Sequence, residues 1–184
     1  MSGEKLRRLT PLGLSVTLDY SPNLARTRHV RSVRILAVVD PLLVSPIGVV
    51  VNGEREVTRG DWSSVTSELR LEDQHAERLL GLIDYSHVIV LGWLHEVPAE
   101  LRERAIAYPA GDDRLPLQGA LALRGGTRPN PLSFTVCELD RIEAASLFVR
   151  GLDLVDGSPI LDVKPYIAFY DARPDATLPG WAAG

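Results

Sequence analysis

Cysteine and long apolar segments are scarce in this chain. The 184 residues include one cysteine, Cys137, so an internal disulfide framework and a Cys-rich zinc site are both excluded. No apolar run approaches the roughly 20 residues of a membrane helix. The N-terminus lacks the clean apolar core and cleavage site of a signal peptide. We therefore expect a cytoplasmic protein that has no membrane partner.

The motifs of several common enzyme classes are also missing. No Gly-rich phosphate loop is present, because residues 124–127 (RGGT) are not followed by a predicted helix. The chain has no G-x-S-x-G nucleophile motif. His87 and His95 flank one predicted strand, and an extended chain of about 3.3 Å per residue separates them by more than about 20 Å. The sequence therefore predicts no metal site.

Charge is distributed unevenly along the chain. The net charge is −4, yet residues 1–34 hold seven Lys or Arg and two acids, a net of +5, which leaves −9 for the other 150 residues. The basic side chains of this arm are Lys5, Arg7, Arg8, Arg26, Arg28, Arg31 and Arg34. Such an arm is typical either of a solvated tail or of a segment that contacts RNA phosphates.

Short apolar runs between frequent prolines and glycines favour strands over long helices. The predicted strands are 33–39, 47–51, 63–71, 88–94, 117–123, 132–142, 146–152 and 160–163. Asn52-Gly53 is a strong hairpin signal. A helix is expected at 72–83, with an apolar face formed by Leu71, Leu79, Leu80, Leu82 and Ile83, and a further turn or two of helix at 100–107. This pattern predicts a single mainly β domain, a barrel or a sandwich.

The second half of the chain resembles the TrmO (TsaA-like) family. The residues that carry the resemblance are 127–131 (TRPNP) and 151–166 (GLDLVDGSPILDVKPY), with 47–50 (IGVV), 85–87 (YSH) and 172–181 in support. The similar region covers about residues 46–181. The resemblance implies that residues 46–184 form a TsaA-like β-barrel domain with one short helix, and that residues 1–45 are an N-terminal extension.

Enzymes of this family use S-adenosylmethionine to N-methylate threonylcarbamoyl-adenosine beside the anticodon of tRNA, and they work as dimers. The resemblance therefore implies an S-adenosylmethionine-dependent methyltransferase that forms a homodimer and takes tRNA as its substrate. Two alternatives stay open: a methyltransferase with a small-metabolite acceptor, and a cofactor-binding relative without catalysis. The acidic body of the chain favours the metabolite, whereas the basic arm favours tRNA.

Cofactor contacts carried over from the family fall on a dispersed set of residues. They are Leu94, His95, Arg124, Phe134, Arg150, Gly151, Leu152 and Asp153. Pro129 and Pro131 stiffen the turn around Asn130. A stiff turn can hold Arg124 and Arg128 toward one pocket. We therefore add Asn130 and Arg128 to the residues expected to bind the cofactor. An arginine fork suits a carboxylate such as that of the methionyl end of the cofactor.

The catalytic groups stay open at this stage. A proton acceptor is expected among His95, Asp156 and Asp162, and Lys164 is a candidate to stabilise negative charge on the substrate. Asp156 also suits a tight turn, and Lys164 suits an ion pair with a neighbouring acid. Two stretches depart from the family: residues 52–57 (NGEREV) stand where a Pro-Arg-Gln run is usual, and Gly125-Gly126 replaces Ser-Pro before the TRPNP run.

Overall fold

The computed structural model describes residues 7–9, 15–17, 42–56 and 60–182. The chain divides into two compact units between Leu43 and Val44. In the first unit β1 (Arg7–Leu9) pairs antiparallel with β2 (Ser15–Thr17). The predicted strand at 33–39 and the arginines of the basic arm from Arg26 to Arg34 lie outside the described residues.

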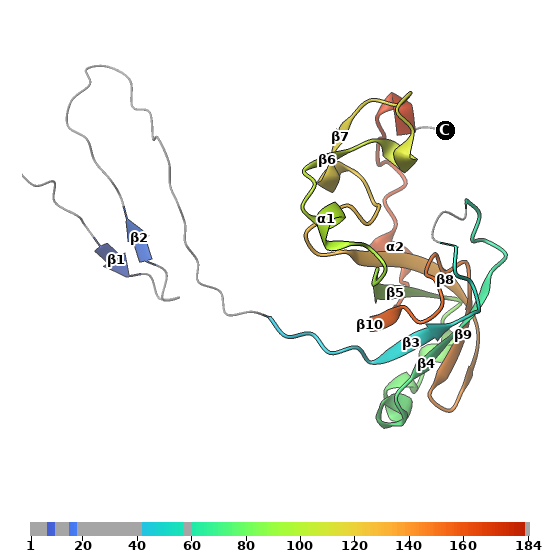
Figure 1. Ribbon diagram of the computed structural model, residues 1–184. Helices are drawn as coiled ribbons and strands as arrows, with labels where there is room; N and C mark the ends of the chain where they lie inside the picture. The colour runs from blue at the N-terminus through green and yellow to red at the C-terminus, as the bar shows by residue number, and fades with distance from the viewer. Residues whose placement is uncertain (1–6, 10–14, 18–41, 57–59, 183–184) are drawn as a thin grey trace, which may run out of the picture. The chain divides into compact units, whose positions relative to one another are not determined.

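The second unit is built on a closed antiparallel barrel (Figure 1). Its strands are β3 (Gly48–Val51), β4 (Thr66–Leu71), β5 (His87–Trp93), β8 (Leu132–Glu143), β9 (Ser146–Arg150) and β10 (Pro159–Pro165). Around the barrel they follow the order β10-β3-β4-β9-β8-β5, so that the last strand closes on β5. The prediction of a mainly β barrel is confirmed, and the sandwich alternative is wrong.

Alternating side chains of the strands fill the barrel. In β4, Leu69 and Leu71 are buried, while Glu68 and Arg70, which alternate with them, point outward and form an ion pair. Leu147 of β9 and Val90 of β5 are completely buried in the same core. A period of two is the geometry of a pleated strand, and burial of each large aliphatic side chain contributes about 1.5–3 kcal/mol. The core therefore fixes the register that positions the loops at the barrel rim.

The predicted helix at 72–83 is wrong in kind. Two 3-10 helices occupy the segment, η1 (Asp73–Leu79) and η2 (Leu82–Asp84). Leu80, with a φ of −55° and a ψ of 124°, ends η1. Gly81 before η2 has a φ of 80°, a left-handed conformation that glycine adopts at little cost. Leu79 is buried, but Leu80 is 94% exposed, so the expected apolar face is only partly used.

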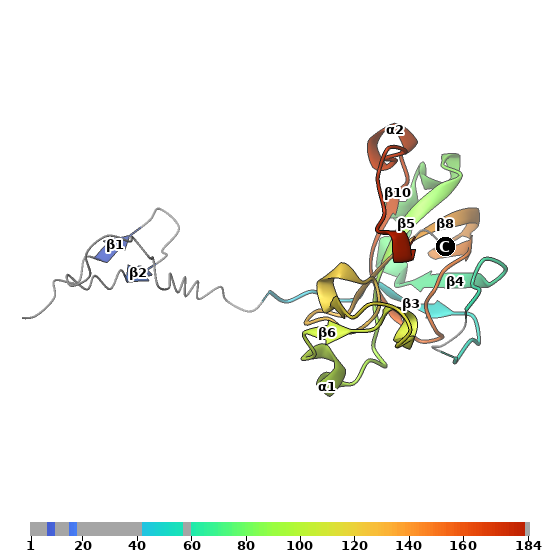
Figure 2. The ribbon, with the colours of Figure 1, turned by 90° about the horizontal axis from the view of Figure 1, so that it is seen from above.

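The connection between β5 and β8 also differs from the prediction. It contains α1 (Ala99–Arg102), β6 (Ile106–Ala107), η3 (Pro109–Gly111), β7 (Gln118–Gly119) and η4 (Ala120–Ala122). The predicted helix at 100–107 is thus a single turn, and the predicted strand at 117–123 is two residues of strand before a 3-10 turn. Pro98 and Pro109 leave no room for a longer helix. Figures 1 and 2 place this excursion on the side of the barrel away from η1 and η2.

The hairpin predicted at Asn52-Gly53 is wrong as a two-residue turn. β3 and β4 do pair antiparallel, with Val51 opposite Glu68, but residues 52–65 connect them. After β10 the chain continues into α2 (Ala168–Asp171) and η5 (Gly180–Ala182). Within the described residues, every helix is too short or too polar to cross a membrane.

Candidate functional site

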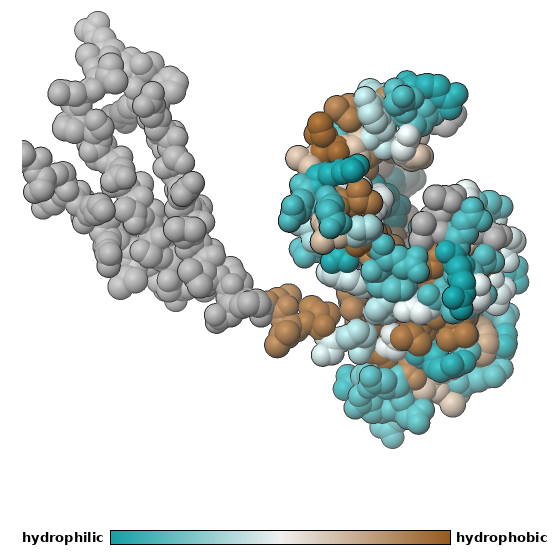
Figure 3. Space-filling model, in the orientation of Figure 1, coloured by the Kyte–Doolittle hydropathy of each residue, from teal (hydrophilic) through white to brown (hydrophobic). Residues whose placement is uncertain are grey.

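A pocket of about 410 Å³ opens at the barrel rim where β5 ends and β8 begins. Four stretches form its walls: the segment after β5, the loop before β8 with the first residues of β8, the β9–β10 connection, and the β3–β4 connection. The lining residues are Trp62, Leu94, His95, Glu96, Val97, Pro98, Leu101, Arg124, Gly125, Gly126, Arg128, Leu132, Ser133, Phe134, Asp153, Val155 and Ser158. Figure 3 shows apolar residues between polar ones in the part of this domain that carries α1, β6 and β7. The volume lies in the range of small-molecule sites.

His95 lies two residues after the end of β5 and contacts the β9–β10 connection. Its Nδ1 is 3.3 Å from Oγ of Ser158, a side chain that is only 1% exposed. The backbone of Ser158 is fixed as well, since its carbonyl oxygen accepts a hydrogen bond from the N–H of Val50 at 3.0 Å. A histidine held at Nδ1 presents its Nε2 as the free ring nitrogen. The imidazole is therefore oriented by a rigid part of the barrel.

The two predicted arginines of the loop before β8 have different partners. Nη2 of Arg124 donates to the carbonyl oxygen of Phe134 at 2.6 Å. Arg128 donates from Nε to the carbonyl oxygen of Gly125 at 2.8 Å and from Nη2 to that of Leu123. Both hydrogen bonds of Arg128 close its own loop, whereas Arg124 ties the loop to β8. Arg124 is thus the arginine whose remaining donors suit an anionic group in the pocket.

Gly126 lies where the loop packs against the segment after β5. A Cβ atom at this position would stand 2.5 Å from Cγ2 of Val97 and 3.4 Å from Cδ1 of Leu94. No side chain fits there unless Val97 moves, because carbon atoms pack at about 3.5–4.0 Å. The glycine that departs from the family's usual Ser-Pro therefore allows close contact between two walls of the pocket.

Asp153 is one of two carboxylates that line the pocket, the other being Glu96. The hydroxyl of Thr135 on β8 donates to its Oδ1. Cys137, two residues along the same strand, is 1% exposed, and burial, with a smaller effect of the Asp153 charge, raises the pKa of its thiol to about 12. The structure thus places an accessible acid beside an inert thiol.

Six of the residues predicted to hold the cofactor line this pocket together: Leu94, His95, Arg124, Arg128, Phe134 and Asp153. Asn130, Arg150, Gly151 and Leu152 lie outside the lining. Arg150 is 3.8 Å from Glu138 across the β8–β9 pair, the N–H of Gly151 donates to the carbonyl oxygen of Val65, and the side chain of Leu152 is fully buried in the core.

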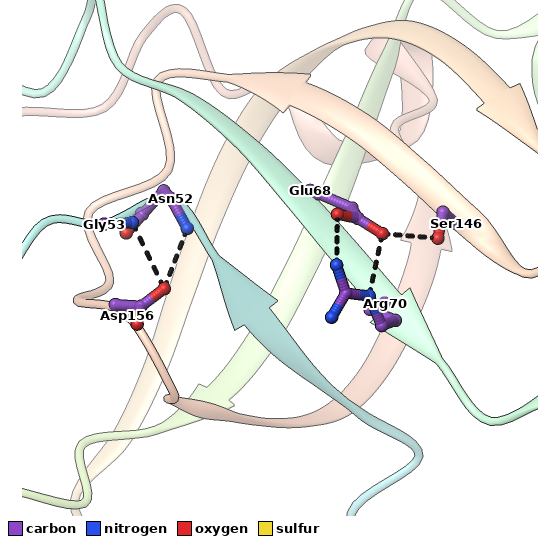
Figure 4. A network of polar contacts seen from close by, with 6 residues as sticks. All are labelled: Asn52, Gly53, Glu68, Arg70, Ser146 and Asp156. Atoms are coloured by element: carbon purple, nitrogen blue, oxygen red, sulfur yellow. Dashed lines mark hydrogen bonds and ion pairs between the residues drawn. The ribbon is translucent and has the colours of Figure 1, made fainter.

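Asp156 supports the chain rather than facing the pocket. Its Oδ1 accepts the N–H groups of Asn52 at 3.0 Å and Gly53 at 3.1 Å (Figure 4). These two backbone hydrogen bonds, followed by the charge of Arg55, hold the pKa of the Asp156 carboxyl below its usual value. A carboxyl group with a lowered pKa is a weaker proton acceptor.

Asp162 and Lys164 form an ion pair with each other on β10. Asp162 lines a different cavity, of about 500 Å³, between β10 and the η1–η2 segment, together with residues such as His75, Leu79, Leu82 and Tyr85. Among the described residues no group of three or more His, Cys, Asp or Glu side chains could hold a metal ion.

Trp62, Ser133, Val155 and Ser158 also line the pocket, although the sequence did not mark them as site residues. Ser158 and Val155 lie inside the matched run 151–166, so their place in the motif was an available signal. Trp62 lies outside the runs that carried the resemblance, and no signal in the sequence pointed to it.

The domain is a closed antiparallel barrel with an apolar pocket at one rim. A histidine, an arginine and a carboxylate line this pocket. These features define a small-molecule-binding β-barrel domain. Residues 58–172 match the family model described as the tRNA-methyltransferase O N-terminal domain. This chain belongs to the tRNA-methyltransferase O (TrmO) family, and the resemblance inferred from the sequence is confirmed.

Relatives with known names support the assignment. The chain is 48% identical over 103 residues to a tRNA (adenine(37)-N6)-methyltransferase of Eikenella corrodens, covering 54% of this chain and 57% of that enzyme. It is 33% identical over 129 residues to an S-adenosyl-L-methionine-binding protein of Archaeoglobus fulgidus, covering 68% and 89% of the two chains.

A solved structure agrees with the same family. The crystal structure of TrmO from Pseudomonas aeruginosa superposes with a TM-score of 0.59 at 31% identity, covering 74% of this chain and 61% of that one. The chain therefore spans somewhat more than half the length of the Eikenella enzyme and of the Pseudomonas TrmO.

Proposed function

We propose that this protein is an S-adenosylmethionine-dependent methyltransferase whose cofactor lies in the pocket between His95, Arg124 and Asp153. The observation that carries the proposal is the convergence of these three side chains, from distant parts of the chain, on one pocket of about 410 Å³. Names of the Eikenella and Archaeoglobus relatives, one a methyltransferase and the other an S-adenosyl-L-methionine-binding protein, support the same cofactor.

The residues present fit the chemical parts of this cofactor. The donors of Arg124 suit the carboxylate of the methionyl end, and the oxygens of Asp153 suit the ribose hydroxyls or the amino group. Leu94, Val97 and Phe134 supply apolar contact for the uncharged portions. Replacement of Arg124 by Ala is expected to weaken cofactor binding by about 1.5–3 kcal/mol, whereas Arg128→Ala should act mainly on the loop.

His95 is the base in this proposal. When bound, S-adenosylmethionine supplies a methyl group on a sulfonium, so that the C–S bond breaks as the N–C bond forms and S-adenosylhomocysteine leaves. Nε2 of His95 accepts the proton that the acceptor nitrogen loses, while Nδ1 stays against Ser158. Asp156 and Asp162 are less suited, because the first binds backbone N–H groups and the second pairs with Lys164 at another cavity.

The methyl acceptor in this proposal is the N6 nitrogen of threonylcarbamoyl-adenosine beside the anticodon of tRNA. The tRNA methyltransferase relatives support a tRNA acceptor, and a cytoplasmic location belongs to the same proposal. An acidic body must then capture a polyanion. The basic arm of residues 1–34 is the segment with a strong positive excess, and we assign Arg26, Arg28, Arg31 and Arg34 to phosphate contacts that position RNA without reading its sequence.

The functional unit in this proposal is a C2 homodimer. Large apolar side chains lie exposed on the second unit, among them Leu80, which is 94% exposed, and Phe169, which is 90% exposed. Side chains of this kind commonly become buried in subunit interfaces. Light scattering at micromolar concentration should give the mass of two chains, and a monomer would contradict the dimer.

Incubation with methyl-labelled cofactor tests the whole proposal. Label should enter bulk tRNA when wild-type protein is present, and Arg124→Ala should reduce this transfer at low cofactor concentration. Label that enters a metabolite extract but not tRNA would favour the small-molecule acceptor. Cofactor binding without transfer to either pool would identify a non-catalytic relative.

A further inference from the structure

The β3–β4 connection brings one aromatic side chain, Trp62, into the pocket. The indole lies in the lining together with Asp153 and Val155, and Trp62 is half-buried. Among the lining residues Trp62 and Phe134 are the only aromatic ones apart from His95. Trp62 lies outside the runs that carried the family resemblance.

Hydrogen bonds attach both ends of this connection to the β9–β10 connection, which carries Asp153. At the first end, Asp156 accepts the N–H groups of Asn52 and Gly53, and Nδ2 of Asn52 donates to the carbonyl oxygen of Leu154 at 3.0 Å. The carbonyl oxygen of Glu54 in turn accepts the N–H of Asp156 at 2.7 Å.

The second end is anchored close to Trp62 itself. The carbonyl oxygen of Trp62 accepts the N–H of Val65 at 3.0 Å, and the carbonyl oxygen of Val65 accepts the N–H of Gly151, also at 3.0 Å. Oδ1 of Asp61 accepts the N–H of Ser63 at 2.9 Å. Because Val65 is only 6% exposed, this turn is fixed to the core. The backbone that carries Trp62 is therefore fixed, and its side chain lines the same pocket as Asp153.

Trp62 and Asp153 together have the chemistry of a nucleoside site. The face of an indole stacks on a purine, and a carboxylate oxygen accepts hydrogen bonds from ribose hydroxyls. Arg124 lines the same pocket from the loop before β8, where it bonds to the backbone of Phe134. A ligand that carries both a carboxylate and a nucleoside matches this set of groups.

We propose that Trp62 stacks on the adenine ring of the cofactor and so determines the affinity of the pocket for an adenosyl group. This inference rests on the proposed function, which supplies the cofactor. It assigns to Trp62 a binding role and no part in the methyl transfer.

Three probes separate stacking on the purine from an attraction between the indole and the sulfonium cation. Adenosine carries only the nucleoside, S-adenosylhomocysteine adds a neutral thioether, and S-adenosylmethionine adds the sulfonium. Stacking predicts that Trp62→Ala weakens binding of all three by a similar factor, on the order of 5- to 150-fold. Trp62→Phe keeps an aromatic face and should recover much of the affinity. A loss confined to S-adenosylmethionine would overturn the purine assignment in favour of a cation–π contact.

Fluorescence gives a readout that a merely structural role would not change. The chain has three tryptophans, so a Trp93→Phe/Trp181→Phe variant leaves Trp62 as its sole indole. Adenosine and S-adenosylhomocysteine should each quench the emission of this variant. The matched control is Trp62→Phe, which retains Trp93 and Trp181 and should show no quenching. Far-UV circular dichroism of each variant checks that the barrel is folded.

The outcomes distinguish the two proposals. If S-adenosylhomocysteine binds the wild type while Trp62 emission and the affinity of Trp62→Ala stay unchanged, the role of Trp62 is wrong and the cofactor assignment stands. If adenosine quenches Trp62 but no methyl transfer occurs, the inference stands and the proposed activity fails. If none of the three probes binds the wild type, both are wrong.

Discussion

His95 and Ser158 are held together across the rim of the barrel, with Nδ1 of His95 3.3 Å from Oγ of Ser158, although 63 residues separate them in the sequence. The serine is buried and fixed beside β3, whereas the imidazole lines the open pocket. This contact joins the end of β5 to the β9–β10 connection and orients one ring nitrogen toward the space where a substrate would lie.

Replacement of His95 by Gln should lower the rate of methyl transfer by about 100- to 10,000-fold, the usual contribution of a general base. Ser158→Ala removes only the orienting hydrogen bond and should lower the rate by roughly 2- to 12-fold. Single-turnover transfer at saturating cofactor measures both effects. If His95→Gln transfers methyl groups as fast as the wild type, His95 is not the base.

Gly126→Ala should destabilise the domain, since the added methyl group would stand 2.5 Å from Val97. Overpacking of this kind costs about 1–3 kcal/mol. The matched control is Gly125→Ala, where a Cβ atom meets nothing within 4 Å, and the change in its free energy of unfolding should stay within about 0.5 kcal/mol. Urea denaturation measures both variants, and equal stabilities would contradict the close contact between the two loops.

Asp156→Asn should make stability less dependent on pH. The pKa of Asp156 is lowered in the folded chain by the N–H groups of Asn52 and Gly53, so its ionised form stabilises the fold above the ordinary aspartate pKa. That stabilisation is lost as the pH falls through the lowered pKa. The variant should be less stable than the wild type by about 1 kcal/mol at neutral pH, and the difference should shrink on acidification. A difference that is constant down to acidic pH would contradict this role.

The thiol of Cys137 should resist modification in the native protein. It is buried, and its pKa is raised to about 12, so the reactive thiolate is scarce at neutral pH. Treatment with a disulfide reagent should label no cysteine in the folded chain and one per chain in denaturant. Rapid labelling of the native protein would show that β8 opens or that Cys137 is accessible.

The secondary structure of segments with a strong local pattern of apolar residues was predictable from the sequence. The apolar run that forms β5 and the alternating pattern of β8 gave their strands to within a few residues. The helix at 72–83 was not predictable in its observed form, because apolar spacing does not reveal that Gly81 adopts a positive φ. The prediction of a two-residue hairpin turn at Asn52-Gly53 was wrong, because the N–H of Asn52 instead donates to Asp156, 104 residues away in the sequence.

Site residues were predictable from the sequence only where they lie in or near a recognisable motif. Arg124, Phe134 and Asp153 lie in or near matched runs, and they line one pocket with His95. Trp62 was missed because its position depends on hydrogen bonds between two connections that are far apart in the sequence. The roles of Arg124 and Arg128 were likewise indistinguishable before their carbonyl partners were known.

Methyl transfer to tRNA tests the central claim most directly. Wild-type protein, methyl-labelled S-adenosylmethionine and tRNA that contains threonylcarbamoyl-adenosine would be incubated together, and the tRNA would then be digested to nucleosides for mass spectrometry. We predict that one labelled methyl group appears on threonylcarbamoyl-adenosine, and that His95→Gln and Arg124→Ala reduce its yield. Unmodified threonylcarbamoyl-adenosine after prolonged incubation, in a sample where cofactor binding is demonstrated, would contradict the account.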